Sequence, residues 1–123
     1  MIKRIWRGAG LIWFAGLLGA CAPSLPPVDS GTLDAIRGDR PWATLADLQE
    51  GRRLFAGRCG ACHGLPEPKR YTPEKWPGLV ASMAKPAQID TAQARKILDW
   101  VLSRQRQDAR LPDRAGKSVG VAD

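Results

Sequence analysis

The residues that point most directly to chemistry form one short run near the middle of the chain: Cys59, Gly60, Ala61, Cys62 and His63. Each thiol of this C-x-x-C-H run can add across a vinyl group of a haem, and the histidine can then bind the iron from one side. The spacing suits this chemistry because two thioethers hold the ring at neighbouring edges while the imidazole reaches its centre. C-x-x-C-H is a signature of c-type haem attachment, so the run predicts one covalent haem held by Cys59, Cys62 and His63.

Three other interpretations of the two thiols stay open. A structural zinc site needs four ligands, and this run supplies only three. A thioredoxin-like redox pair would lie next to a strand–helix–strand pattern, and the sequence shows no convincing strands. A disulfide between Cys59 and Cys62 would close a very small loop. The sequence favours haem attachment over all three.

Met83 is the candidate for the second axial ligand of the iron. It is the only methionine apart from Met1, and a thioether is a soft, neutral ligand that suits reduced iron. Met/His ligation is typical of electron-transferring cytochromes c. The alternatives are that Met83 only fills space in the core, or that Lys85 binds the iron instead. Because His63 is the only histidine, ligation by two histidines of this chain is excluded.

The N-terminal residues resemble the export signal of a bacterial lipoprotein. Three basic residues precede an apolar run over residues 9–18, which is too short to cross the ~30 Å hydrocarbon core of a bilayer as a helix. Residues 18–21 then read Leu-Gly-Ala-Cys, which resembles the lipobox at which such signals are cut. The resemblance implies a signal peptide over residues 1–20 and a lipidated Cys21. An uncleaved anchor or a plain signal peptide is the alternative.

The cysteine count agrees with both interpretations. Lipidation uses Cys21 and haem attachment uses the other two cysteines, so none of the three is left free in an exported protein. A lipid anchor implies a protein on the periplasmic side of a bacterial membrane. Ala22 follows the cysteine in place of an acidic residue, which by resemblance to enterobacterial sorting favours the outer membrane over the inner.

The first expected helix begins at Thr44, whose side chain can cap it together with Asp47, and it ends at Gly57. A second glycine inside this helix, Gly51, is informative because glycine in a helix interior costs about 1 kcal/mol relative to alanine. A close crossing by another helix would account for that cost.

Two further helices are expected after the C-x-x-C-H motif. One begins at Thr72, with Pro73 at its first position, and Pro86 stops it. The last helix has Asp90 as its cap and Gln93 three residues on, which is the pattern of a capping box. Since no strands are expected, the sequence predicts an all-α domain.

Gly51 and Phe55, followed by the C-x-x-C-H motif, resemble the opening of a class I cytochrome c domain. In that family the N-terminal helix carries a glycine and an aromatic residue where it crosses the C-terminal helix, which implies that Trp100 packs against Gly51 and Phe55. The spacing of Trp76 and Met83 is also similar to that of small bacterial cytochromes c. The resemblance implies a small cytochrome c fold, with three to four helices around one covalently attached haem c.

The chain is accordingly divided into four parts. Residues 1–20 form the signal peptide, and residues 21–43 form a lipidated N-terminus and flexible tether with many prolines and glycines. Residues 44–106 form the cytochrome c domain, and residues 107–123 form a polar C-terminal tail.

The charge balance does not indicate a nucleic-acid partner. The formal net charge of +7 includes three basic residues of the signal, and the other basic residues are scattered without a basic–aromatic recognition pattern. Four of them lie near the expected haem edge and either steer an acidic redox partner or form an ordinary solvated surface: Lys69, Arg70, Lys75 and Lys85.

The resemblance therefore implies a monohaem c-type electron carrier that is tethered to the membrane, exchanges electrons with redox partner proteins and is not an enzyme. One alternative is a haem-binding subunit of a larger respiratory complex. Another is a five-coordinate haem enzyme or gas sensor, which would need Met83 away from the iron.

Overall fold

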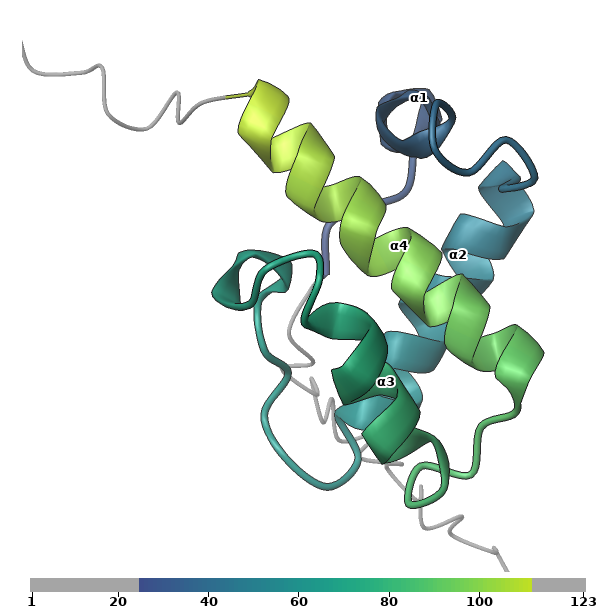
Figure 1. The fold of residues 1–123 in the computed structure, drawn as a ribbon, viewed down its shortest axis with the longest axis vertical. Coiled ribbons are helices and arrows are strands. Elements are labelled where there is room, and N and C mark those ends of the chain that lie inside the picture. The colour runs from purple at the N-terminus through teal and green to yellow at the C-terminus, as the bar shows by residue number, and fades with distance from the viewer. Residues whose placement is uncertain (1–24, 112–123) are drawn as a thin grey trace, which may run out of the picture.

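The computed structural model describes residues 25–111, and every regular element in that range is helical (Figure 1). The prediction of an all-α domain is therefore confirmed for the described residues. Within this range, no helix combines the length and the apolar character needed to cross a bilayer. The predicted signal peptide and Cys21 lie outside the described residues. The elements, in chain order, are α1 (Ser30–Ile36), α2 (Leu45–Leu54), the π-helical turn η1 (Phe55–Cys59), the 3₁₀ turn η2 (Pro68–Arg70), α3 (Trp76–Ala84) and α4 (Thr91–Arg110).

The long helix α4 is the element against which the rest of the fold packs. It runs diagonally across the view in Figure 1, and α1, α2 and α3 all contact it. Its start is a complete capping box. The Gln93 N–H donates to Asp90 Oδ1 at 2.8 Å, and the Asp90 N–H donates to Gln93 Oε1 at 3.0 Å. These bonds satisfy backbone groups that a helix start leaves unpaired, so the predicted start of the last helix is confirmed.

The core lies between α2, α3 and α4, and three buried aromatic side chains occupy its centre. Phe55 and Trp100 pack with ring centroids 5.0 Å apart, and Trp76 meets Phe55 edge to face at 6.2 Å. Burial of a large apolar side chain stabilises a fold by roughly 1.5–3 kcal/mol. Tertiary packing of this kind, more than helix propensity, stabilises helices as short as α2 and α3.

The crossing of α2 and α4 is close because Gly51 has no side chain. A Cβ at Gly51 would lie 2.0 Å from the carbonyl oxygen of Lys96 and 3.1 Å from Cβ of Trp100. Only glycine allows the two backbones to approach this far. The expected contact of Trp100 with Gly51 and Phe55 is therefore confirmed.

The segment before α2 is folded, and the prediction of a flexible tether over residues 21–43 is wrong for the part that the structure describes. Helix α1 has a capping box of its own, in which the Thr32 N–H donates to Asp29 Oδ1 at 2.8 Å. Thr32, Ala35 and Ile36 are buried. The sequence did not reveal this helix because seven residues make only two turns, too few for a helical period to show among prolines and glycines.

Polar contacts attach this N-terminal segment to α2 and α4. Arg40 donates to Oδ1 of the buried Asp99 at 2.6 Å. Arg52 donates to the backbone carbonyls of Leu25 and Pro26, at 2.6 and 2.8 Å. The folded domain therefore includes residues from Leu25 onward and does not begin at α2.

Two predicted helix boundaries in the middle of the chain are wrong. The chain does not leave the helix at Gly57 but continues through η1 to Cys59, because Gly57 lacks the positive φ of a helix-ending glycine. Helix α3 begins at Trp76 and not at Thr72, which only precedes a turn. Pro77 occupies the first turn of α3, where a missing N–H leaves no helical bond broken.

The C-terminal boundary also differs from the prediction. Helix α4 continues to Arg110, so residues 107–110 belong to the domain and not to the polar tail. Gln107 contacts α1, because its Oε1 accepts from the Thr32 hydroxyl at 3.1 Å and its Nε2 donates to Asp29 Oδ1 at 3.2 Å. These contacts to α1 give the last turns of α4 a packing partner.

Candidate functional site

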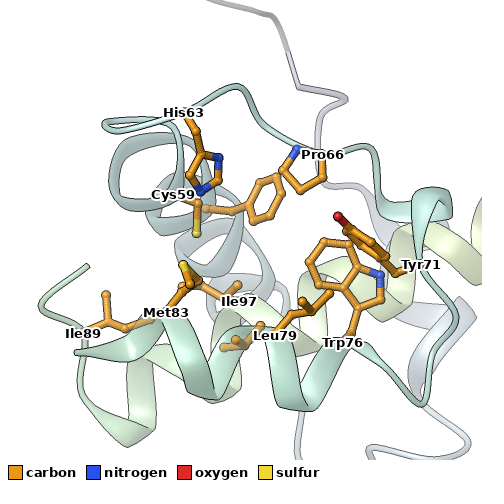
Figure 2. A pocket seen from close by; sticks show the side chains of 11 residues that line it. Cys59, His63, Pro66, Tyr71, Trp76, Leu79, Met83, Ile89 and Ile97 are labelled. Carbon is orange, nitrogen blue, oxygen red and sulfur yellow. The ribbon is translucent and has the colours of Figure 1, made fainter. Parts of the chain in front are cut away.

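An apolar cavity of about 220 Å³ lies between η1, α3 and the N-terminal half of α4 (Figure 2). Its volume is several times the ~30 Å³ that one water molecule occupies in the liquid. The cavity is therefore large enough for an apolar group and is more than a packing defect. Its lining residues are Phe55, Cys59, His63, Pro66, Tyr71, Trp76, Leu79, Val80, Met83, Ile89 and Ile97.

The structure brings together the residues that the sequence singled out. Cys59, His63 and Met83 line the apolar cavity, and the same three residues line a smaller cavity of about 50 Å³ together with Cys62. Figure 2 shows the imidazole of His63 on one side of Cys59 and the thioether sulfur of Met83 on the other. Met83 meets the motif because α2 and α3 both pack against α4.

Cys59 is positioned by the π-helical turn η1, a type of turn that is frequent at functional sites. The chain then turns tightly at Gly60, where a Cβ would lie 2.5 Å from the carbonyl oxygen of Ala56. Burial raises the pKa of the Cys59 thiol above its ordinary value. Cys62 is exposed, and neither cysteine is in a disulfide.

His63 has its two ring nitrogens in different roles. Nδ1 lies 2.9 Å from the carbonyl oxygen of Gly64. Because a carbonyl oxygen only accepts, Nδ1 is the donor, and in the neutral imidazole this tautomer has its lone pair on Nε2. Histidines that bind metals commonly donate their other ring N–H to a carbonyl in this way. The arrangement leaves Nε2 of a neutral His63 as the nitrogen that is free to bind a metal.

Met83 projects from the last turn of α3 and lines both cavities. It is 42% exposed, whereas Val80 on the preceding turn is 8% exposed. A methionine that only filled space in the core would be buried. The position of Met83 therefore favours a role for its sulfur at the cavity over the core-filling alternative.

The other end of the cavity is aromatic. Trp76 and Tyr71 meet edge to face at 5.6 Å, and Trp76 Nε1 donates to the carbonyl of Pro68 at 2.9 Å. Gln105 on α4 donates to the carbonyls of Pro68 and Tyr71, at 2.7 and 2.6 Å. The sequence predicted only a loop here and missed Pro66 and Tyr71 as lining residues. The one available signal was that Tyr71 is the single tyrosine of the chain.

Basic side chains lie near both ends of the apolar cavity. The ammonium of Lys75 and the guanidinium of Arg70 lie 5.2 and 5.9 Å from the ring centroid of Tyr71. Arg58, which the sequence did not single out, lines the smaller cavity with the motif residues. Lys69 lines one cavity with Arg70 and Tyr71 and another with Leu25. Three of the predicted basic residues, Lys69, Arg70 and Lys75, therefore lie around Tyr71.

Within residues 25–111, no group of three or more histidine, cysteine, aspartate or glutamate side chains is placed to hold a metal ion. Comparison of the chain with protein-family models, with curated proteins and with solved structures finds no match.

Proposed function

We propose that the chain is a monohaem c-type cytochrome that transfers electrons on the periplasmic side of a bacterial membrane. The observation that carries the proposal is that Cys59, His63 and Met83 line one apolar cavity. These three side chains come from two segments of the chain, and their chemistry differs: a thiol, an imidazole and a thioether. No single structural role, such as core packing, calls for that combination.

The residues fit a covalent haem c. Cys59 and Cys62 would each form a thioether, His63 would hold the iron through Nε2, and Met83 would hold it through sulfur. The lining beyond these residues is aromatic and aliphatic, as an apolar macrocycle requires. When bound, haem c supplies an iron that gains and loses one electron, and Met/His ligation would raise its reduction potential as in electron-transfer cytochromes.

The lining also favours electron transfer over substrate chemistry. Among the described residues around the apolar cavity, none is a carboxylate, an amine or a guanidinium that could act as a general acid or base. Tyr71 supplies the one hydroxyl. This lining gives an electron carrier more support than a five-coordinate haem enzyme.

Two partners are proposed: an acidic redox protein, from the basic side chains near the cavity, and the membrane, from the lipobox-like N-terminal sequence. Basic groups such as Arg58 and Lys75 near the cavity would attract an acidic redox protein. The proposal retains the lipid anchor at Cys21, with the outer membrane favoured over the inner.

The test is whether haem becomes covalently attached. The full chain would be produced in a bacterial host that matures c-type cytochromes, and run on a denaturing gel that is stained for haem peroxidase activity. We expect a haem-stained band for the parent chain and no stained band when Cys59→Ser and Cys62→Ser are combined. The matched control, Cys21→Ser, should keep the stain because its thiol is outside the haem motif. An unstained parent chain, beside a stained reference cytochrome from the same host, would overturn the proposal.

A further inference from the structure

The first described residues are held firmly against the domain. Arg52 on α2 donates to the backbone carbonyls of Leu25 and Pro26, at 2.6 and 2.8 Å. The side chains of Leu25 and Val28 pack against the hydrophobic core. Pro26 and Pro27 restrict the backbone between Leu25 and Val28, since proline fixes φ near −65°. Leu25 is therefore fixed to the folded domain.

The attachment of Leu25 limits how far the domain can move from a lipid anchor at Cys21. Cys21 precedes Leu25 by four residues, and consecutive Cα atoms are about 3.8 Å apart. The two Cα atoms are therefore no more than about 15 Å apart. A tether that extended to residue 43 would instead reach about 80 Å when fully extended.

The maximum distance between Cys21 and Leu25 is short compared with the diameter of the domain. A folded chain of the length of residues 25–111 has a radius of gyration of about 12 Å, so its diameter exceeds a link of about 15 Å. The side of the domain opposite to Leu25 cannot turn toward the bilayer while acyl chains on Cys21 remain inserted. The position of Leu25 thus selects the surface that meets the membrane.

We propose that the surface around Leu25, called here the Leu25 surface, rests on the phospholipid headgroups of the membrane. The inference depends on the lipid anchor of the proposed function. The Leu25 surface borders a cavity of about 320 Å³, and it includes the loop after the motif and the end of α4. Its exposed members are Pro26, Glu67, Lys69 and Asp108.

The proposed haem edge lies outside the Leu25 surface. Within residues 25–111, none of the residues that line the small cavity at Cys62 and Met83 lines the cavity at Leu25. Pro66 lines both the apolar cavity and the cavity at Leu25, and Figure 2 shows it away from Met83. A domain that rests on the Leu25 surface would leave the Met83 side open to a redox partner from the periplasm.

The experiment measures which surface the membrane shields. The full chain, matured with haem and acyl groups, would be added to preformed vesicles of phosphatidylethanolamine and phosphatidylglycerol. Lys69→Cys places a reactive thiol on the Leu25 surface, and Lys85→Cys places one beside α3; both lysines are exposed. The native cysteines are blocked in the mature protein. The rate of reaction with a bulky polyethylene-glycol maleimide would be compared with that of matched chains carrying about 20 inserted Gly/Ser residues after Ala22, which span ~25 Å on average.

We expect Lys69→Cys to react several-fold more slowly with the native link than with the lengthened link, and Lys85→Cys to react equally fast with both. Equal rates for Lys69→Cys, or slow reaction of Lys85→Cys with the native link, would overturn the orientation. Mass spectrometry of the mature chain separates the two proposals. If Cys21 carries acyl chains and the rates are equal, only the orientation fails. If Cys21 carries none, the lipid anchor fails and the orientation with it.

Discussion

The carbonyl oxygen of Lys96 on α4 lies so close to Gly51 on α2 that a Cβ at Gly51 would be 2.0 Å from it. The same crossing brings Trp100 of α4 against Phe55, whose ring lines the apolar cavity. A backbone contact in the core therefore helps to determine the shape of the candidate haem site.

Gly51→Ala should destabilise the domain by about 2–3 kcal/mol, because the added methyl group forces α2 and α4 apart. The loss should exceed the ~1 kcal/mol that alanine gains over glycine in a helix. Gly78→Ala in α3 is the matched control, since a Cβ there meets nothing within 4 Å; we expect a gain of up to ~1 kcal/mol. Urea unfolding measures both changes. A Gly51→Ala chain as stable as the parent would show that the crossing is not tight.

Ile36→Ala tests whether α1 belongs to the folded domain. Ile36 is fully buried, so its truncation should cost about 2–5 kcal/mol in the free energy of unfolding. Leu45→Ala is the control, because Leu45 is 37% exposed and should lose much less. If both substitutions have the same small effect, the N-terminal segment behaves as the flexible tether that the sequence suggested.

The Arg40–Asp99 ion pair should contribute more to stability than an exposed ion pair with the same N···O distance. Arg40→Met leaves the buried Asp99 without its cation, and breaking a buried pair costs about 3–5 kcal/mol. Arg53→Met is the control: its pair with Glu50 has the same 2.6 Å length, but Arg53 is exposed, so the loss should stay below about 1 kcal/mol. The double variant Arg40→Met/Asp99→Leu should recover most of the loss. Similar losses for Arg40→Met and Arg53→Met would contradict this account.

Asp99 should also give the Arg40→Met chain a distinctive pH dependence. Burial raises the pKa of Asp99, and Arg40 opposes that rise. With the cation removed, the folded-state pKa lies further above the unfolded value of about 3.9. At Asp99 the folded state then binds more protons than the unfolded state, so the contribution of Asp99 to stability is greatest below about pH 4 and falls as the pH rises through the folded-state pKa. Urea midpoints measured from pH 3 to about pH 8 should fall more for Arg40→Met than for the parent.

Met83→Leu tests the axial thioether, since leucine keeps the size and removes the sulfur. We expect the oxidised protein to change from low spin to high spin, to lose the far-red band of Met–iron ligation, and to fall in reduction potential by on the order of 0.1 V. Lys85→Ala is the control and should leave the spectrum unchanged. An unchanged spectrum for Met83→Leu would remove Met83 from the iron, and a changed spectrum for Lys85→Ala would point to lysine.

The sequence by itself determined the features that depend on near neighbours. The spacing of Cys59, Cys62 and His63 is fixed by the covalent chain, because the three residues lie within one five-residue run. The cap of α4 at Asp90 needs only a side chain and a backbone N–H three residues apart. Gly51 indicated a close crossing with another helix, because glycine inside a helix is unfavourable and no feature of the neighbouring sequence required it.

Only the tertiary structure decided where the domain begins and what surrounds the site. Helix α1 is too short to be stable alone, and it forms because Ile36 is buried and Thr32 bonds to Gln107 on α4. Tyr71 reaches the cavity because Gln105 holds the backbone of its loop. Such contacts join residues tens of positions apart, and neither spacing nor periodicity records them. Local sequence patterns could identify the residues of the candidate site. Their positions relative to one another depend on how the other helices pack against α4.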